Sequence, residues 1–426
     1  MDDFKIRFEW EQSPRSRVPE LDATWARLQI DIGSESATRV EVTRSESIRS
    51  AIYVPLYPIA EWMVTNWWSL WHEWRRTPGR ESGHCLLSAR EGFALPDLSF
   101  WPSESQIELD WRRSTAPSAG LSFLTGGTAR LPKQLVRDEF CRLVLAVLER
   151  LDQRNVHGSY LSEEWAAIEA AEQDPEQRAF CERAARLGCN PFDLEASTAE
   201  QIERLGSQLP ESLIDDFCDS IRLDEFASGS ATLRAFLTDA GLATPVAGHW
   251  DECSARIREH ESVAPWNDGY RQAQALRAYL GIEGPILDDL QDLLRDRLGS
   301  LEIRPLATVS NIDAISAPSP SGAPVFGLRL RQREDQNRFT ISRAIAGFLP
   351  RGLPTLVTRG IAEHQQRNRA FAAEFLAPAA SIRTRLLSPS LADEDVEELA
   401  REFRVSDYVI RHQIQNHNLA KLSAYH

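Results

Sequence analysis

The sequence predicts a predominantly helical α+β fold, with a strand-rich domain first, a helical region next and a second mixed domain at the C-terminal end. Three observations support this prediction. Apolar and polar residues alternate near the N-terminus, apolar residues recur at helical spacing through the middle, and strand-like segments return after Gly299. A chain of 426 residues is long enough for two or three domains. We expect them at residues 1–115, 116–270 and 271–426.

The composition is that of a globular protein, with 42% hydrophobic and 26% charged residues. It excludes a wholly disordered chain and a coiled-coil rod. No apolar run approaches the roughly 18 residues of a membrane-spanning helix. Residues 1–12 lack a basic start followed by an apolar run, so no signal peptide is expected. The six cysteines have no C-x-x-C spacing and are expected to be reduced thiols of a cytoplasmic protein.

Alternation of apolar and polar side chains, the period of a half-buried strand, predicts the strands of the first domain. It is clearest at residues 4–10, where Phe4, Ile6, Phe8 and Trp10 alternate with charged residues. The same alternation recurs, more weakly, at residues 26–32, 38–43 and 106–111.

Residues 57–74 predict a tryptophan-rich helix that begins near Pro58. Trp67, Trp71 and Trp74 fall on one stripe of that helix. In one interpretation the stripe packs on the small sheet. In the other it forms an aromatic surface that grips a peptide or a partner protein, which makes the three tryptophans candidate partner-binding residues.

Helices are expected through most of residues 130–298. Pro132 indicates a helix start, and Asp174 followed by Pro175 indicates an N-cap with proline in the first turn. Leucine–glycine pairs that end at Gly281 and at Gly299 indicate helix ends, and their spacing is not that of a fixed repeat.

Charge is distributed unevenly along the chain, whose formal net charge is −15. Residues 159–230 carry 17 acidic side chains, five arginines and no lysine, whereas residues 329–385 carry 11 arginines and four acidic side chains. Both segments fit solvated helix surfaces. They also fit docking of one part of the chain on another, or a basic face for an acidic partner.

After Gly299 the pattern returns to a mixture of strands and helices. Short strands are expected within residues 301–307 and 323–330, joined by a turn at residues 316–322. Helices are expected at residues 337–349 and 367–378, followed by two short helices within residues 395–419 that meet near residues 404–406.

This last part of the chain resembles a known family. Arg338, Phe339 and Thr340 open the predicted helix at 337–349, the letters FAAEFLAP occupy residues 371–378, and residues 396–416 form the terminal helix pair. Over residues 272–426 this arrangement is similar to the ImmA/IrrE family of zinc metallopeptidases. The resemblance implies a zincin-like domain, and a family whose active members cleave repressor proteins in phage immunity and DNA-damage responses.

The residues of the family's HExxH metal motif are absent at the matching positions. In such a motif two histidines bind zinc and the glutamate acts as general base. The resemblance places Arg343 at the first histidine, Ala344 at the glutamate and Gly347 at the second histidine. None of these side chains can bind a metal in this setting. The third ligand position falls at residues 365–367, which hold no carboxylate, so no metal and no cofactor are expected.

Two neighbouring side chains complete this degenerate site. Glu363 and His364 lie close to the third ligand position and could be remnants of it. Arg343 could take the place of a metal by pairing with a carboxylate such as Glu363. The alternative interpretation is that Arg343 is an ordinary surface arginine.

The sequence therefore favours a catalytically degenerate relative of these peptidases that acts by protein binding in bacterial stress, mobile-element or antiphage settings. One alternative is an active metallopeptidase with a non-standard site built from Glu363, His364 and an N-terminal histidine. Another is a nucleic-acid-associated regulator that uses residues 329–385. DNA binding by the terminal helix pair is not favoured, because residues 393–421 hold seven acidic and four basic side chains.

Overall fold

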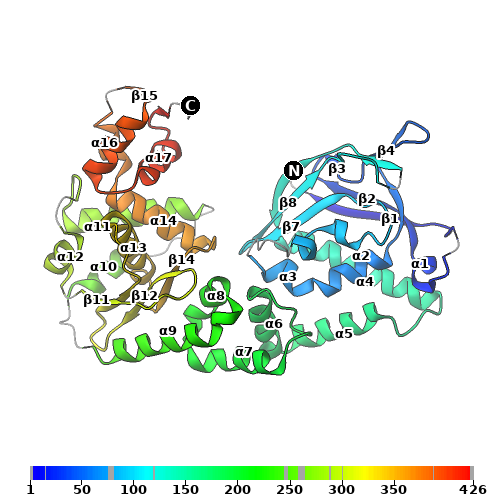
Figure 1. Cartoon of the computed structure of the whole chain (residues 1–426), viewed down its shortest axis with the longest axis horizontal. Helices are drawn as coiled ribbons and strands as arrows, with labels where there is room; N and C mark the ends of the chain where they lie inside the picture. The colour runs from blue at the N-terminus through cyan, green and yellow to red at the C-terminus, as the bar shows by residue number, and fades with distance from the viewer. Residues whose placement is uncertain are drawn as a thin grey trace. The chain divides into compact units, whose positions relative to one another are not determined.

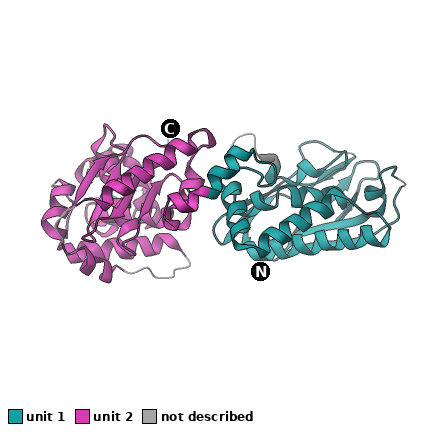
Figure 2. Cartoon of the chain, turned by 90° about the horizontal axis from the view of Figure 1, so that it is seen from below, with its two compact units in different colours: residues 1–203 teal, residues 204–426 magenta. Residues whose placement is uncertain are grey.

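The computed structural model describes the chain except residues 1–2, 15, 75–80, 119, 244–247, 258–263, 287–288, 300, 387 and 423–426. It is 51% helix and 19% strand, which confirms the predicted α+β class. The chain divides into two compact units, residues 1–203 and residues 204–426 (Figure 2). This division falls inside the predicted helical middle, so each unit combines sheets with helices.

The described residues of unit 1 form three antiparallel sheets, drawn in blue to cyan in Figure 1. All four segments with alternating residues contain strands, and in β1, β2 and β8 buried residues alternate with more exposed ones. The sheets consist of β1 (Phe4–Trp10), β2 (Trp25–Ile32), β3 (Glu35–Ser36) and β6 (Ile52–Pro55); β7 (Asp97–Pro102), β8 (Gln106–Arg112) and β10 (Gly127–Pro132); and β4 (Val40–Val42), β5 (Ser47–Arg49) and β9 (Leu121–Phe123).

The tryptophan-rich segment forms two helices rather than one, α2 (Tyr57–Thr65) and α3 (Trp67–His72). They separate at Asn66, whose side-chain amide donates a hydrogen bond to the Trp62 carbonyl at 2.8 Å. Trp67 and Trp71 are each 1% exposed and belong to the core of unit 1, and the half-buried Trp74 lies under the Arg186 guanidinium. The stripe is thus part of the core, and Trp67 and Trp71 have no surface to offer a partner.

The remaining helices of unit 1 pack on its sheets and on one another. The long α4 contacts β1, β8 and α2, and its row of apolar residues is fully buried. Asp174 caps α6 as predicted, because its carboxylate accepts hydrogen bonds from the backbone N–H groups of Glu176 and Gln177. The helices are α1 (Pro19–Ala23), η1 (Glu81–His84), η2 (Leu86–Ala89), α4 (Lys133–Gln153), α5 (Tyr160–Gln173) and α6 (Pro175–Arg186).

The helix α7 (Ala196–Gln208) spans the division between the units, and further helices surround the sheet of unit 2. Gly281 ends α11 with a φ of 66°, a conformation that favours glycine, as its position in the sequence predicts. These helices are α8 (Glu211–Ser220), η3 (Leu223–Glu225), α9 (Phe226–Gly241), α10 (Trp250–Arg256), α11 (Pro265–Leu280) and α12 (Leu290–Leu298).

Unit 2 is built on a four-stranded mixed sheet in the order β11, β13, β12, β14. The strands are β11 (Glu302–Pro305), β12 (Ile312–Pro318), β13 (Pro324–Leu328) and β14 (Thr355–Thr358). The two strands expected here are present as β11 and β13. The turn expected at residues 316–322 was placed too early, because β12 continues through Pro318 before the chain reverses.

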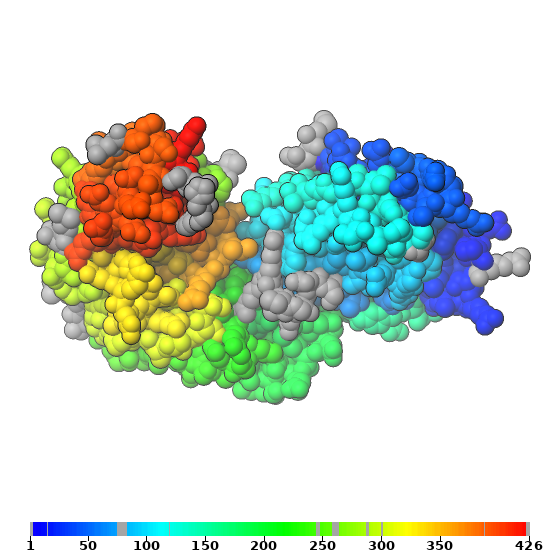
Figure 3. Space-filling model, turned by 45° about the horizontal axis from the view of Figure 1, so that its top comes forward, coloured from blue at the N-terminus to red at the C-terminus, as the bar shows by residue number. Residues whose placement is uncertain are grey.

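Helices α13 (Glu334–Phe348) and α14 (Glu363–Leu376) follow the strands and lie against the sheet and α11 (Figure 1). The chain ends with α15 (Ala379–Arg383), β15 (Ser390–Leu391), α16 (Asp393–Phe403), α17 (Asp407–Asn416) and β16 (Lys421–Leu422). The terminal helix pair is therefore present as expected, with Arg404 in a left-handed conformation between its helices. Arg404 also pairs with Glu334. Figure 3 shows the orange and red surface of the terminal elements beside the yellow surface of unit 2.

None of the helices in the part of the chain that the structure describes combines the length and the apolar character needed to cross a membrane.

Candidate functional site

Unit 2 contains a cavity of about 840 Å³ whose walls come from α11, α13, α14 and α17 and from the segments beside β12 and β14. Its lining combines arginines, amides and aromatic rings. Trp266 on α11 and Tyr408 on α17 are 46% and 69% exposed, respectively, so the cavity has aromatic side chains that face solvent. Exposed aromatic groups beside charged side chains are typical of binding sites.

Arg343 lines this cavity from the middle of α13 and is only 6% exposed. Its Nη2 group donates to the Thr358 carbonyl oxygen at 2.5 Å and to Gln365 Oε1 at 2.8 Å. Burial, with a further contribution from Arg369, lowers the pKa of Arg343 to about 9. It therefore remains a cation at neutral pH, and the interpretation of Arg343 as a surface arginine is wrong.

Gln365 connects Arg343 to the outer edge of β14. Its side-chain amide donates to the Leu356 carbonyl at 2.8 Å and accepts from the Thr358 N–H at 3.2 Å. A carbonyl and an N–H two residues apart project from the same edge of a strand, and β12 occupies the opposite edge of β14. Gln365 thus makes the hydrogen bonds that another strand would make, and closes this part of the edge.

Asp216 on α8 is the buried carboxylate of this network. One of its oxygens accepts from Gln365 Nε2 at 3.0 Å and lies 2.8 Å from His364 Nε2. Its negative charge raises the pKa of Arg343, which partly opposes the effect of burial. Arg343, Gln365 and Asp216 therefore form a continuous chain of hydrogen bonds from the cavity to α8.

Asp216 was missed in the sequence, where its acidic neighbourhood suggested a solvated helix face. It is 6% exposed. A signal was present, because Leu213, Phe217 and Ser220 share one face of α8 with Asp216 and all three are buried. An aspartate inside such a row is a candidate for a buried hydrogen-bonded role.

The expected pairing of Arg343 with Glu363 is not the one observed, since its acceptors are the Thr358 carbonyl and Gln365. Glu363 is the first residue of α14. His364 does come close to the network, but through Asp216. The carboxylate that compensates Arg343 thus comes from a distant part of the sequence.

The residues at the implied metal positions do not fit a metal. Arg343 remains protonated, Ala344 has no donor atom, and Gln365 uses its amide on β14 and Asp216. At Gly347 a Cβ atom would meet Thr355 Oγ1 at 2.8 Å, so α13 has no room there for a histidine. Among the described residues, no three histidine, cysteine or acidic side chains are grouped to hold a metal ion.

The cavity has more cations than anions. Asp313 pairs with Arg331 at 2.6 Å and lies 3.9 Å from Arg359 Nε. Arg369 donates to the Gly360 carbonyl at 2.9 Å, and burial lowers its pKa. The charged lining consists of Arg331, Arg343, Arg359 and Arg369, with Asp313 and Asp335.

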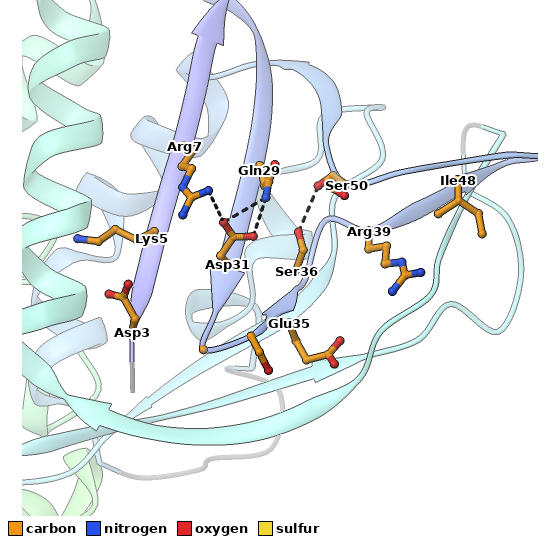
Figure 4. Close-up of a pocket in the computed structure, with 12 residues that line it drawn as sticks. Asp3, Lys5, Arg7, Gln29, Asp31, Glu35, Ser36, Arg39, Ile48 and Ser50 are labelled. Atoms are coloured by element: carbon orange, nitrogen blue, oxygen red, sulfur yellow. Dashed lines mark hydrogen bonds and ion pairs between the residues drawn. The ribbon is translucent and has the colours of Figure 1, made fainter. Parts of the chain in front are cut away.

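A second cavity, of about 460 Å³, lies in unit 1 beside β1, β2 and β3 (Figure 4). Its charges are locally balanced, because Asp31 pairs with Arg7 at 3.5 Å and accepts from Gln29 at 2.8 Å, and Lys5 pairs with Glu139. No residue that lines it is buried. The cavity of unit 2, with a buried cation, is the stronger candidate site.

Comparisons of the chain with protein-family models, with curated proteins and with solved structures found no match.

Proposed function

We propose that this chain is a catalytically degenerate ImmA/IrrE-like protein whose C-terminal unit binds a protein segment in the cavity of unit 2. In this proposal it is a regulatory or scaffold module of a bacterial stress, mobile-element or antiphage system. The part of the cavity that would hold a metal in an active relative holds side chains that cannot do so.

The hydrogen bond between Arg343 and Gln365 is the observation that carries this proposal. The resemblance places the first metal ligand at Arg343 and the third within residues 365–367, and in this structure Arg343 contacts Gln365 at 2.8 Å. A guanidinium and an amide thus join the two helices that metal ligation would otherwise join. The cavity above them keeps its aromatic rim, which suits recognition of side chains.

The first experiment measures metal content and peptide cleavage on the same preparation of the full chain. We expect less than about 0.1 equivalent of zinc, iron or manganese by elemental mass spectrometry, since the site lacks metal ligands. We also expect no cleavage of a random peptide library. Cleavage together with about one equivalent of metal that is lost in His364→Ala would instead support an active metallopeptidase.

The second experiment selects binders from the same peptide library on the immobilised full chain. We expect a defined sequence class, recovered uncut, whose enrichment is lost in Tyr408→Ala. The matched control is Tyr53→Ala, an exposed tyrosine of unit 1, which should leave enrichment unchanged. Equal loss in both variants, or no enriched class, would contradict protein binding by this cavity.

A further inference from the structure

The buried Arg343 and the half-buried Arg369 have no carboxylate as a hydrogen-bond partner among the described residues. Arg343 donates to the Thr358 carbonyl and to Gln365, and Arg369 donates to the Gly360 carbonyl. All of these acceptors are neutral. Buried charges are normally paired with an opposite charge, so this pair of cations is undercompensated.

Arg343 also has a hydrogen-bond donor that is not used within the described part of the chain. The Nε atom of Arg343 is buried and has no hydrogen-bond partner among the described residues, although the side chain lines the cavity. A buried N–H group without an acceptor is uncommon in native proteins and requires an explanation. Burial lowers the pKa values of Arg343 and Arg369, and the charges of Asp313 and Asp216 offset this only in part at Arg343.

The two carboxylates of the lining are engaged elsewhere. Asp313 is shared by Arg331 and Arg359, and Asp335 pairs with Arg333 at 2.7 Å. Neither is hydrogen-bonded to Arg343 or Arg369. Asp216 reaches Arg343 only through Gln365, so an anion that bonds directly to those two arginines must come from outside the described part of the chain.

We propose that the cavity binds a carboxylate group of an acidic protein segment, held by Arg343 and Arg369 and attracted by the more exposed Arg359. This inference rests on the proposed function and specifies the chemistry of the bound segment. Guanidinium groups suit this role because they donate paired hydrogen bonds in the plane of a carboxylate. The aromatic rings of Trp266 and Tyr408 would contact the neighbouring side chains of the segment.

The surroundings favour a peptide carboxylate over a nucleic acid. The helix pair α16–α17 contributes Tyr408 to the cavity, yet residues 393–421 hold seven acidic side chains and four basic ones. Asp313 and Asp335 also line the cavity. A chain of phosphates would be repelled by these groups, whereas one carboxylate inside the cavity meets mainly arginines.

The test uses three fluorescein-labelled probes and the full chain, with binding measured by fluorescence anisotropy. The probes are a decapeptide of alternating glutamate and tyrosine, its analogue with glutamine in place of glutamate, and decathymidylate. We expect the glutamate peptide to bind at least about tenfold more tightly than the glutamine analogue, because charged hydrogen bonds are lost in the analogue. Decathymidylate should bind more weakly than the glutamate peptide.

Two variants locate the carboxylate. Arg369→Met should weaken binding of the glutamate peptide by about tenfold or more and leave the glutamine analogue unchanged. The matched control is Arg383→Met, which replaces an exposed arginine of the same unit outside the cavity lining. It should leave the affinity for both peptides unchanged.

The outcomes separate this inference from the proposed function. Equal affinity for the two peptides, with binding still lost in Tyr408→Ala, would overturn carboxylate recognition and leave protein binding in place. Peptide binding that is unchanged in Arg369→Met and in Tyr408→Ala would contradict both carboxylate recognition and protein binding by this cavity. Tighter binding of decathymidylate than of the glutamate peptide would overturn the assignment of the ligand class.

Discussion

Replacement of Arg343 by alanine should lower the free energy of unfolding of residues 204–426 by about 2 kcal/mol. The guanidinium makes two hydrogen bonds to buried acceptors, the Thr358 carbonyl and Gln365 Oε1. Hydrogen bonds from a charged group contribute about 1.5–3 kcal/mol each, and the variant leaves the Thr358 carbonyl without this donor. Part of the loss is returned, because a cation whose pKa burial lowers to about 9 no longer has to be desolvated.

Thermal unfolding of the full chain, followed by circular dichroism, measures this effect. For a unit of 223 residues a loss of about 2 kcal/mol corresponds to a decrease in Tm of roughly 4–8 °C. Arg383→Ala removes an exposed arginine from the same unit and should change stability by no more than about 0.5 kcal/mol. The loss of stability in Arg343→Lys should lie between the losses in the two alanine variants, since lysine keeps the charge but lacks the planar pair of donors.

A melting temperature of Arg343→Ala within about 1 °C of the wild-type chain would contradict a stabilising role of Arg343, since that result is expected only for a surface residue without partners. A melting temperature of Arg343→Lys equal to that of the wild-type chain would show that a point charge suffices and that the hydrogen bonds to Thr358 and Gln365 contribute nothing.

Three further changes test neighbouring features of the structure. Gln365→Glu should destabilise unit 2 at pH 8, and less at pH 5, in urea unfolding. The amide donor to the Leu356 carbonyl and to Asp216 is lost, and the new carboxylate faces both acceptors. These two acceptors favour the protonated acid and raise its folded-state pKa against the opposing charge of Arg343, so stability is present at low pH and lost as pH rises. Gly347→Ala should lower the free energy of unfolding by about 1–3 kcal/mol, because the added Cβ meets Thr355 Oγ1. A gain of about 1 kcal/mol, the usual effect of replacing glycine by alanine in a helix, would contradict this close contact. In unit 1, burial lowers the pKa of Lys133 to about 8. Above that pH the unfolded state binds more protons than the folded state, so the stability of the wild-type chain relative to Lys133→Met should rise between pH 8 and 10. A stability difference that stays constant over this pH range would refute the prediction.

The strands predicted in unit 1 have side chains that alternate between buried and more exposed positions, whereas β13 was predicted from a short apolar run and is buried at all five residues. Residues 4–10 alternate visibly because β1 is half-buried, and so do residues 106–111 in β8. By contrast, six of the seven residues of β12 are buried, so its sequence shows no alternation, and two polar residues and a proline conceal it further. The four-residue β14 is too short for any period to show.

The site was predictable where it depends on neighbouring helices and not where it depends on distant segments. The motifs around Thr340 and Phe371 position α13 against α14, and this places Arg343 beside Gln365. Asp216 enters through α8, nearly 150 residues earlier in the chain, and no local pattern connects the two segments. Only the tertiary packing of α8 on β14 brings this carboxylate to the network.

Under the proposed function, the same packing predicts that introducing the metal motif would not create a peptidase. An extended peptide commonly binds a sheet by adding a strand to a free edge. At Leu356 and Thr358 the edge of β14 is already occupied by the Gln365 amide. A glutamate at this position would supply a metal ligand but would lose the hydrogen bond to the Leu356 carbonyl and would face Asp216. A histidine at Gly347 would in addition collide with Thr355. The groups that do not fit a metal also stabilise the edge of the sheet, which is consistent with the proposed recognition of side chains by the arginines and aromatic rings of the cavity.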